Sequence, residues 1–219
     1  MAREDRTAKG RGGRPSLKRA AEIDARLLSA AATLFLERGV DGTSLEAVAA
    51  AAAVGKPTLY ARYPDKSALF AAVIRTNVAA ALPPIDGPHA GASPEDRLRH
   101  VGRAVIEGAM QPVPLSLMRL YIAEAPRHGA LIREVDRMGR EAALDTIAAA
   151  LVDTQDADVM ARAREAAGVF LDVAFVPHQV RMLLGDPPNE ADDLHPTLEE
   201  RIDHAVAILA AMALLRRSE

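Results

Sequence analysis

The stretch that decides the fold runs from Gly39 to Phe70 and reads GVDGTSLEAVAAAAAVGKPTLYARYPDKSALF. Thr43 and Glu46 have the spacing of a capping box, in which the Thr hydroxyl and the Glu carboxylate satisfy free N–H groups at a helix start. Apolar residues then follow at helical spacing, at positions 45, 48, 49 and 52. The pattern predicts a helix that begins just after Thr43.

Two further helices are predicted directly behind this one. The small residues at 53–55 interrupt the first helix, and Pro57 suits the first turn of the next because its missing N–H has no partner there. Pro64 ends that short helix, since the residue before a proline is pushed out of the α region. Asp65 is a typical cap for a longer helix that follows. The three elements together predict a helix-turn-helix with a third helix attached.

Thirteen positions of this stretch, taken in order, resemble the DNA-binding segment of the TetR family of transcriptional regulators. They are Gly39, Thr43, Leu45, Val48, Ala49, Ala52, Val54, Thr58, Leu59, Tyr60, Tyr63, Lys66 and Leu69. The chain departs from the usual family residues at Ala53, Gly55 and Pro57. The resemblance implies an all-α protein of about nine helices, with an N-terminal three-helix helix-turn-helix domain and a C-terminal helical bundle that dimerises.

The resemblance also implies which residues contact DNA. Lys56 and Thr58 would reach base edges in the major groove, where Lys can bind guanine acceptors and Thr a thymine methyl. The residues implied to contact the phosphate backbone are Thr43, Tyr60, Arg62 and Lys66. For each of these positions the alternative is an exposed polar side chain without a role.

Residues 1–19 form a basic segment without apolar periodicity. We expect a flexible arm in which Arg11 and Arg14 enter a minor groove beside the operator, as basic arms of other helix-turn-helix proteins do. A solvated tail is the alternative. Residues 1–75 carry 13 Lys and Arg against 8 Asp and Glu, whereas the remainder is acidic. This asymmetry favours nucleic-acid binding by the first third alone.

Composition restricts the remaining classes of protein. The chain has 219 residues, 49% of them hydrophobic and 26% charged, which is typical of a globular protein. It contains no cysteine, which excludes disulfides and thiolate metal sites. The N-terminus lacks the apolar stretch of a secretory signal, and the longest apolar run, 205–215, is short for a membrane span. We therefore expect a cytoplasmic protein without a membrane partner.

Helical periodicity and breakers predict the other elements. A helix from about 17 to 38, ended by Gly39, would cover the helix-turn-helix. The further helices are expected near 66–82, 94–110, 115–125, 130–152, 157–184 with a kink at Pro177, and 197–217. We predict an arm at 1–19, a DNA-binding domain at 20–66, and a ligand-binding and dimerisation domain at 67–219. The helix that leaves Asp65 would then connect the two functions.

The last helix carries a seam of apolar residues at alternating steps of four and three. The seam consists of Leu198, Ile202, Ala205, Leu209 and Met212. Such spacing suits helix packing at a shallow angle, and by itself it favours burial within the chain. The family resemblance instead implies a four-helix dimer interface, in which Phe170 and Ala174 would form the partner surface.

An apolar cavity between helices of the C-terminal bundle is physically reasonable. We expect Met110, Met118, Tyr121 and Phe170 to line it. Asn77 and His178 would supply polar groups. The expected effector is a small apolar or amphipathic molecule, and ordinary core packing is the alternative for each residue. The stretch 119–127 also resembles the C-terminal domains of TetR regulators related to efflux pumps, without naming a ligand.

The sequence contains no motif that favours an enzyme. The sequence Gly55-Lys56-Pro57-Thr58 lacks the earlier glycine and the preceding strand of a phosphate-binding loop. The six histidines have no metal-ligand spacing on one helix. We therefore expect no enzyme, no cofactor and no metal.

The reading that follows is a ligand-responsive repressor that binds a palindromic operator as a dimer and is released by a small molecule. Two alternatives stay open. The first is a DNA-binding activator or architectural protein without a ligand, which a solidly packed C-terminal domain would favour. The second is a helical small-molecule binding protein or enzyme with a vestigial N-terminal domain, which a failure to bind DNA would favour.

Overall fold

The computed structural model describes residues 17–82, 92–154, 156–185 and 196–215. These residues form the α-helices α1 (Leu17–Arg38), α2 (Leu45–Ala51), α3 (Lys56–Tyr60), α4 (Lys66–Ala80), α5 (Pro94–Ala109), α6 (Pro112–Leu151), α7 (Ala157–Phe170), α8 (Val176–Leu184) and α9 (Leu198–Ala211). A π-helical turn, η1 (Leu171–Phe175), joins α7 to α8. Within the described ranges there is no strand, so the predicted all-α class is confirmed.

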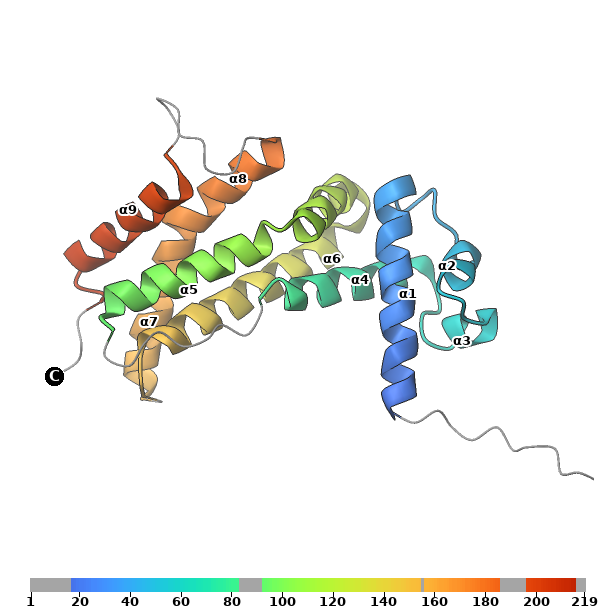
Figure 1. Ribbon diagram of the computed structural model, residues 1–219, viewed down its shortest axis with the longest axis horizontal. Coiled ribbons are helices and arrows are strands. Elements are labelled where there is room, and N and C mark those ends of the chain that lie inside the picture. Colours follow the sequence, from blue (N-terminus) through green and yellow to red (C-terminus); the bar gives the residue numbers. More distant parts are fainter. Residues whose placement is uncertain (1–16, 83–91, 155, 186–195, 216–219) are drawn as a thin grey trace, which may run out of the picture.

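The molecule is elongated, with the helix-turn-helix at one end (Figure 1). Helices α1, α2 and α3 form that end, and α4 runs from it to the larger bundle of α5 to α9. Helix α6 lies along both α4 and α5 and extends to α1, so it contacts both parts of the molecule.

The core of the helix-turn-helix is built from apolar residues at helical spacing. Leu27 and Phe35 of α1 are fully buried, as are Leu59 of α3 and Phe70 of α4. The rings of Phe35 and Phe70 meet edge to face, with centroids 5.6 Å apart, an arrangement that aromatic pairs prefer. Leu117 and Val135 of α6 belong to the same cluster. The DNA-binding unit therefore shares its core with a helix of the other domain.

Of the two helix caps predicted in this region, the cap of α4 is confirmed and the cap of α2 is a different residue. The Asp65 carboxylate accepts a 2.7 Å hydrogen bond from the backbone N–H of Ala68, as expected for a cap. At the start of α2, however, the cap is Ser44, whose hydroxyl accepts from the Ala47 N–H at 3.1 Å. Thr43 is not the cap, because its hydroxyl donates to the carbonyl oxygens of residues 34 and 39.

Helix α6 contains the two helices predicted at 115–125 and 130–152, which meet at a kink. Between Pro112 and Leu151 the backbone leaves helical angles at His128 (φ −122°, ψ 28°). Pro126 lies just before this point. Its ring cannot fit an undistorted helix and it offers no N–H, so the first helix breaks there and the second continues at an angle to it.

The segment from Ala157 to Leu184 runs through α7, η1 and α8. By length and composition alone it is long and apolar enough to cross a membrane, but core helices of globular proteins meet the same test. One face does pack in the core, through Ala166, Phe170 and Ala174. Yet only 28% of its most apolar window is buried within the protomer, so much of this segment faces outward.

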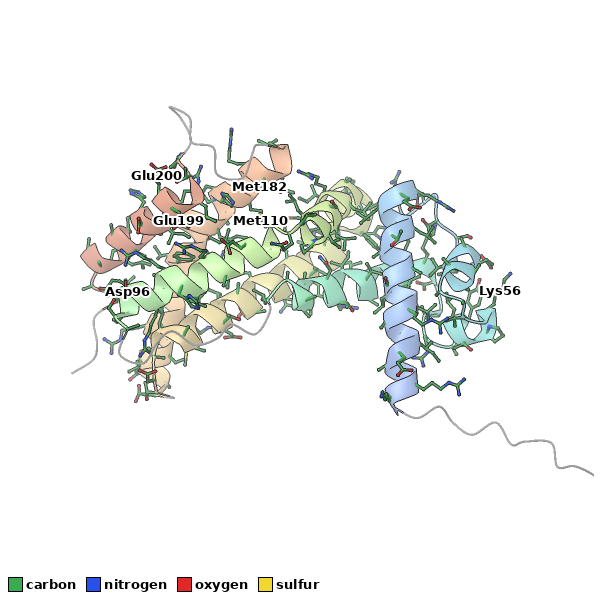
Figure 2. All side chains as sticks on the ribbon, in the orientation of Figure 1. Lys56, Asp96, Met110, Met182, Glu199 and Glu200 are labelled. Atoms are coloured by element: carbon green, nitrogen blue, oxygen red, sulfur yellow. The ribbon has the colours of Figure 1, made fainter. Side chains whose placement is uncertain are left out.

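The second core lies between α5, α6, α7 and α9. The buried ring of Phe170 on α7 packs directly on Gly102 of α5, where an added Cβ would lie 2.2 Å from that ring. Arg99 and Arg103 of α5 pair with Asp203 and Glu199 of α9, the first pair at 2.9 Å. Figure 2 shows Glu199 on α9, next to α5. These contacts fix α9 against its own protomer.

Candidate nucleic-acid interface and effector cavity

Helix α3 presents two exposed polar side chains, Lys56 and Tyr60. Gly55 is its N-cap in extended conformation (φ −65°, ψ 139°), and Pro57 lies in the first turn as predicted. Lys56 is exposed and lies on the outer side of α3, far from the bundle (Figure 2). Thr58 is half-buried and Leu59 is buried in the core. The buried leucine fixes the helix, while the basic end stays accessible.

The turn between α2 and α3 is held by a residue that the sequence did not single out. Ala53 has a left-handed backbone (φ 49°), a conformation that favours glycine. Arg26 of α1 donates hydrogen bonds to the carbonyl oxygens of Ala52 and Ala53, the second at 2.8 Å. These carbonyls lie at the end of α2, where they lack helical partners. A cationic side chain therefore stabilises the turn from across the core.

Tyr60 is exposed at the end of α3, and its hydroxyl donates a 2.9 Å hydrogen bond to the carboxylate of Glu46 on α2. The backbone N–H of Glu46 and then this phenol lower the pKa of the carboxyl group. The same hydrogen bond raises the pKa of Tyr60. The phenol is therefore neutral at physiological pH and retains a lone pair for a further donor.

Three of the predicted phosphate contacts are engaged within the protomer. Thr43 is 2% exposed and bonds to the end of α1. Lys66 donates to the carbonyl oxygens of residues 40 and 41, at 2.8 and 3.1 Å. Arg62 forms a 2.6 Å ion pair with Asp24 of α1. These side chains hold the loop and α1 in place. For Thr43, which is buried, this corrects the expectation that it faces DNA, whereas DNA contact by Arg62 and Lys66 stays a prediction. Arg11 and Arg14 lie outside the described residues.

A cavity of about 350 Å3 opens between α4, α5, α6, η1 and α8. Among the residues predicted to bind a ligand, Asn77, Met118 and Tyr121 line it. The prediction fails for Met110 and Phe170, which are buried in the second core, and for His178, which lies outside the lining. His178 is only 8% exposed; burial, and then the charge of Arg201 on α9, lower its pKa.

The sequence analysis missed the charged residues of the cavity. Asp136 and Arg140 of α6 both line it, as does Gln179 of α8. Arg140 pairs at 2.9 Å with Asp172 of η1. Burial, and then the negative charge of Asp136, raise the pKa of Tyr121 to about 12. Residues 136 and 140 stand one helical turn apart on α6, a spacing that carried no functional signal by itself.

Helix α6 reaches from this cavity to the helix-turn-helix. At its kink, Arg127 lies 3.4 Å from Asp41, in the loop before α2, and 3.6 Å from the largely buried carboxylate of Glu124. The ring of His128 lies 5.7 Å from that of Phe70. The kink thus touches both the loop and the core of the DNA-binding unit.

The predicted dimer seam is mostly internal. Phe170, Ala174, Ile202, Ala205 and Leu209 are fully buried within the protomer, and only Met212 is exposed. The spacing of apolar residues on α9 therefore comes from packing of α9 within its own chain. The prediction that these five residues form a dimer interface is wrong. The exposed apolar residues of this region lie instead on α8. They are Val176, Val180 and Leu184, at steps of four.

Acidic and histidine side chains do not gather into a metal site in the part of the chain that the structure describes. What the described residues offer is an exposed short helix after a tight turn, and an apolar cavity joined to it by two helices. This arrangement defines a helix-turn-helix DNA-binding protein with an apolar cavity in its helical bundle.

Family comparisons agree with this class. Residues 27–73 match the model of bacterial regulatory proteins of the tetR family, and residues 96–212 match that of the C-terminal domain of AefR-like transcriptional repressors. The chain therefore belongs to the TetR family of DNA-binding transcriptional regulators, a non-enzymatic family whose members bind operator DNA.

Individual relatives show how far the similarity extends. An uncharacterised helix-turn-helix transcriptional regulator of Mycobacterium bovis is 35% identical over 112 residues, covering 48% of this chain and 57% of that protein. This chain thus spans little more than half the length of that relative. A TetR-family regulator from Mesorhizobium loti has 26% identity and a TM-score of 0.62, covering 88% of this chain and 98% of its own. The flavonoid-responsive regulator FrrA has 28% identity and a TM-score of 0.66, covering 87% and 97%.

Proposed function

We propose that this regulator is a homodimeric repressor that binds a palindromic operator and leaves it when a small molecule enters the cavity. The observation that carries the proposal is that two helices belong to both parts. Helix α4 contributes Phe70 to the DNA-binding core and Asn77 to the cavity, while α6 contributes Leu117 to that core and Met118 to the cavity. A ligand that displaces either helix displaces the recognition helix as well.

The energetic condition on such a ligand is simple. A ligand shifts an equilibrium between two conformations only by the difference in its affinities for them. The effector must therefore bind more tightly to the conformation in which the two recognition helices do not match the operator.

We assign operator contacts to the exposed residues of α3. Lys56 and Thr58 bind base edges in the major groove. The Tyr60 hydroxyl donates to a phosphate oxygen in place of its hydrogen bond to Glu46. Arg11 and Arg14 of the arm enter the adjacent minor groove. Thr43, Arg62 and Lys66, which have partners within the protomer, position α3 rather than contact DNA.

A second copy of the chain is the partner we assign to the outward face of α8. Val180 and Leu184 are 46% and 72% exposed, and Met212 beyond α9 is 53% exposed. An apolar surface of this kind is typical of an interaction site. A two-fold dimer places its two recognition helices about 34 Å apart, one turn of DNA. Because it acts on DNA, the regulator belongs to the cytoplasm of its cell.

We keep the domain boundaries that were predicted from the sequence. We assign operator binding to residues 20–66 and ligand binding and dimerisation to residues 67–219. A cavity of about 350 Å3 is at the small end of ligand sites, and its lining is mostly apolar. This favours a small apolar or amphipathic effector. FrrA, by its name, responds to flavonoids, so flavonoids are the first compounds to test.

The test measures binding to the intergenic DNA upstream of the gene by fluorescence anisotropy, with the flavonoid naringenin as the first probe. Wild-type protein should bind the DNA and release it as naringenin is added. Gly139→Leu places a larger side chain on a cavity-lining residue, opposite Val78. This variant should bind DNA but resist release, whereas Ala149→Leu, on the exposed face of the same helix, should respond like the wild type.

Two results would contradict the proposal. If the wild type does not bind the upstream DNA even at low salt, the regulator function fails. If the filled-cavity variant is released as readily as the wild type, the cavity is not the effector site. A reporter gene under the same promoter then tells repression from activation, since loss of a repressor raises expression.

A further inference from the structure

The charges that line the cavity are unbalanced, and this imbalance bears on the kind of molecule it accepts. Asp136 and Arg140 lie four residues apart on α6, a spacing at which an acid and a base commonly pair. Arg140 pairs instead with Asp172 of η1, at 2.9 Å. Among the described residues Asp136 forms no ion pair. The lining thus holds one uncompensated negative charge.

The rest of the lining does not offset that charge. The other polar residues of the cavity are neutral amides and a phenol, from Asn77, Gln179 and Tyr121. The remaining lining residues are apolar or small, among them Met118, Leu171 and Phe175. Asp136 is itself exposed to solvent, so a ligand that fills the cavity displaces part of the water around its carboxylate, and a charge that loses water without gaining a partner is disfavoured. A ligand that supplies that partner is therefore favoured over one that does not.

We propose that Asp136 selects the effector by charge. The cavity takes amphiphiles with an apolar body and a cationic or hydrogen-bond-donating head, and it rejects carboxylates of the same shape. This inference rests on the proposed function for its biological meaning, but it concerns the chemistry of the cavity alone and can be tested by ligand binding without DNA.

Three naphthalene compounds of nearly equal shape provide the test. They are 2-naphthylmethylamine, which is cationic, 2-naphthalenemethanol, which is neutral, and 2-naphthoate, which is anionic. The chain contains no Trp, so naphthalene emission reports binding with little background, and calorimetry supplies an independent dissociation constant. Wild-type protein should bind the amine at least about tenfold more tightly than the carboxylate, because like charges brought together are strongly unfavourable. The alcohol should fall between them.

Two substitutions should remove this preference by different routes. Asp136→Asn removes the charge and keeps the shape, so the amine should lose affinity and the carboxylate should gain it. Asp172→Asn releases Arg140, which can then pair with Asp136 one helical turn away; the preference should shrink although Asp172 does not line the cavity. Glu107→Gln, an exposed acid on α5 outside the lining, should leave all three affinities unchanged.

The results separate this inference from the proposed function. Equal binding of the amine and the carboxylate to the wild type would overturn it, as would binding of none of the three compounds or a preference that survives in Asp136→Asn. Thermal unfolding of each variant confirms that it is folded. Charge-selective binding that does not release upstream DNA would leave the inference in place and refute the regulatory role of the cavity.

Discussion

The guanidinium of Arg127, on helix α6, lies 3.4 Å from the carboxylate of Asp41, in the loop that precedes α2. This ion pair joins a helix of the effector cavity to the DNA-binding unit. Both side chains are well exposed, so the pair should contribute less than about 1 kcal/mol to the free energy of unfolding. We expect the pair to matter instead for the coupling between ligand binding in the cavity and DNA binding by the helix-turn-helix.

The first prediction concerns this communication. Arg127→Ala and Asp41→Ala should each leave the melting temperature nearly unchanged but raise the effector concentration needed for release of DNA. The double variant should be no worse than either single variant, because both remove the same contact. Anisotropy titrations of the four proteins give the coupling energy. Additive effects of the two substitutions would show that the pair does not transmit the signal.

The second prediction separates DNA contact from support of the recognition helix. Lys56→Ala should weaken operator binding by about 1–3 kcal/mol, as expected for loss of a base contact. Arg62→Ala removes the 2.6 Å ion pair with Asp24, and should lower the free energy of unfolding by about 1 kcal/mol.

Salt dependence distinguishes the two variants. In a plot of the logarithm of the association constant against the logarithm of the salt concentration, a lost phosphate contact would flatten the slope by about 0.9. Arg62→Ala should leave this slope unchanged. A flatter slope for Arg62→Ala would mean that the arginine leaves Asp24 when DNA is bound.

The third prediction concerns the turn. Ala53 is held at φ 49°, where an L-residue with a Cβ pays about 1 kcal/mol relative to glycine. Ala53→Gly should therefore raise the free energy of unfolding slightly, by up to about 1 kcal/mol. Ala50→Gly, inside α2, should lower it by a similar amount. Urea unfolding measures both, and a destabilised Ala53→Gly variant would contradict the strain assigned to this turn.

The fourth prediction tests the packing of the Phe170 ring on Gly102. A Cβ at position 102 would lie 2.2 Å from the ring of Phe170, which is fully buried. Gly102→Ala should lower the free energy of unfolding by about 1–3 kcal/mol despite the better helix propensity of alanine. Gly168→Ala is the matched control, since its nearest contact would be an ordinary 3.8 Å. Equal stabilities of the two variants would show that the helices move apart at little cost.

The fifth prediction concerns pH. Burial, and then Arg201, lower the pKa of His178 in the folded protein below its usual value, so the unfolded chain binds its proton first. Stability therefore rises with pH over the interval between the folded and unfolded pKa values, and falls as pH drops below about 6.5. His178→Gln should flatten this part of the profile. Thermal melts between neutral and mildly acidic pH measure the slope, and an unchanged slope would assign it to other groups.

Local signals predicted the helices well, because caps and breakers act within a few residues of chain. Asp65 and Ser93 cap the helices that were expected to follow them. The start of α2 shows the limit of such signals. Thr43 and Ser44 are both good caps in sequence, and Ser44 takes the role because the Thr43 hydroxyl is bound by the end of α1, a contact between elements that spacing does not reveal.

The candidate site was harder to predict for the same reason. Arg62 and Lys66 were matched to DNA contacts by position, but their partners within the protomer come from α1 and from the loop before α2. The seam on α9 has the spacing of a helix pair whichever chain the partner helix belongs to, so the sequence could not tell internal burial from a dimer interface. Asp136 stood out only once Arg140 was seen to pair with Asp172.

The π-helical turn η1 has a geometric consequence for the wall of the cavity. A π turn holds about one residue more than an α turn, and each residue of an α-helix advances the side-chain direction by about 100°. The face of α8 is therefore rotated by about that angle relative to a continuous α-helical extension of α7. Deleting one residue from 171–175 would undo this rotation, moving Gln179 away from the cavity and changing which residues of α8 face outward. The extra residue in η1 therefore determines which side chains of α8 face the cavity and which face solvent.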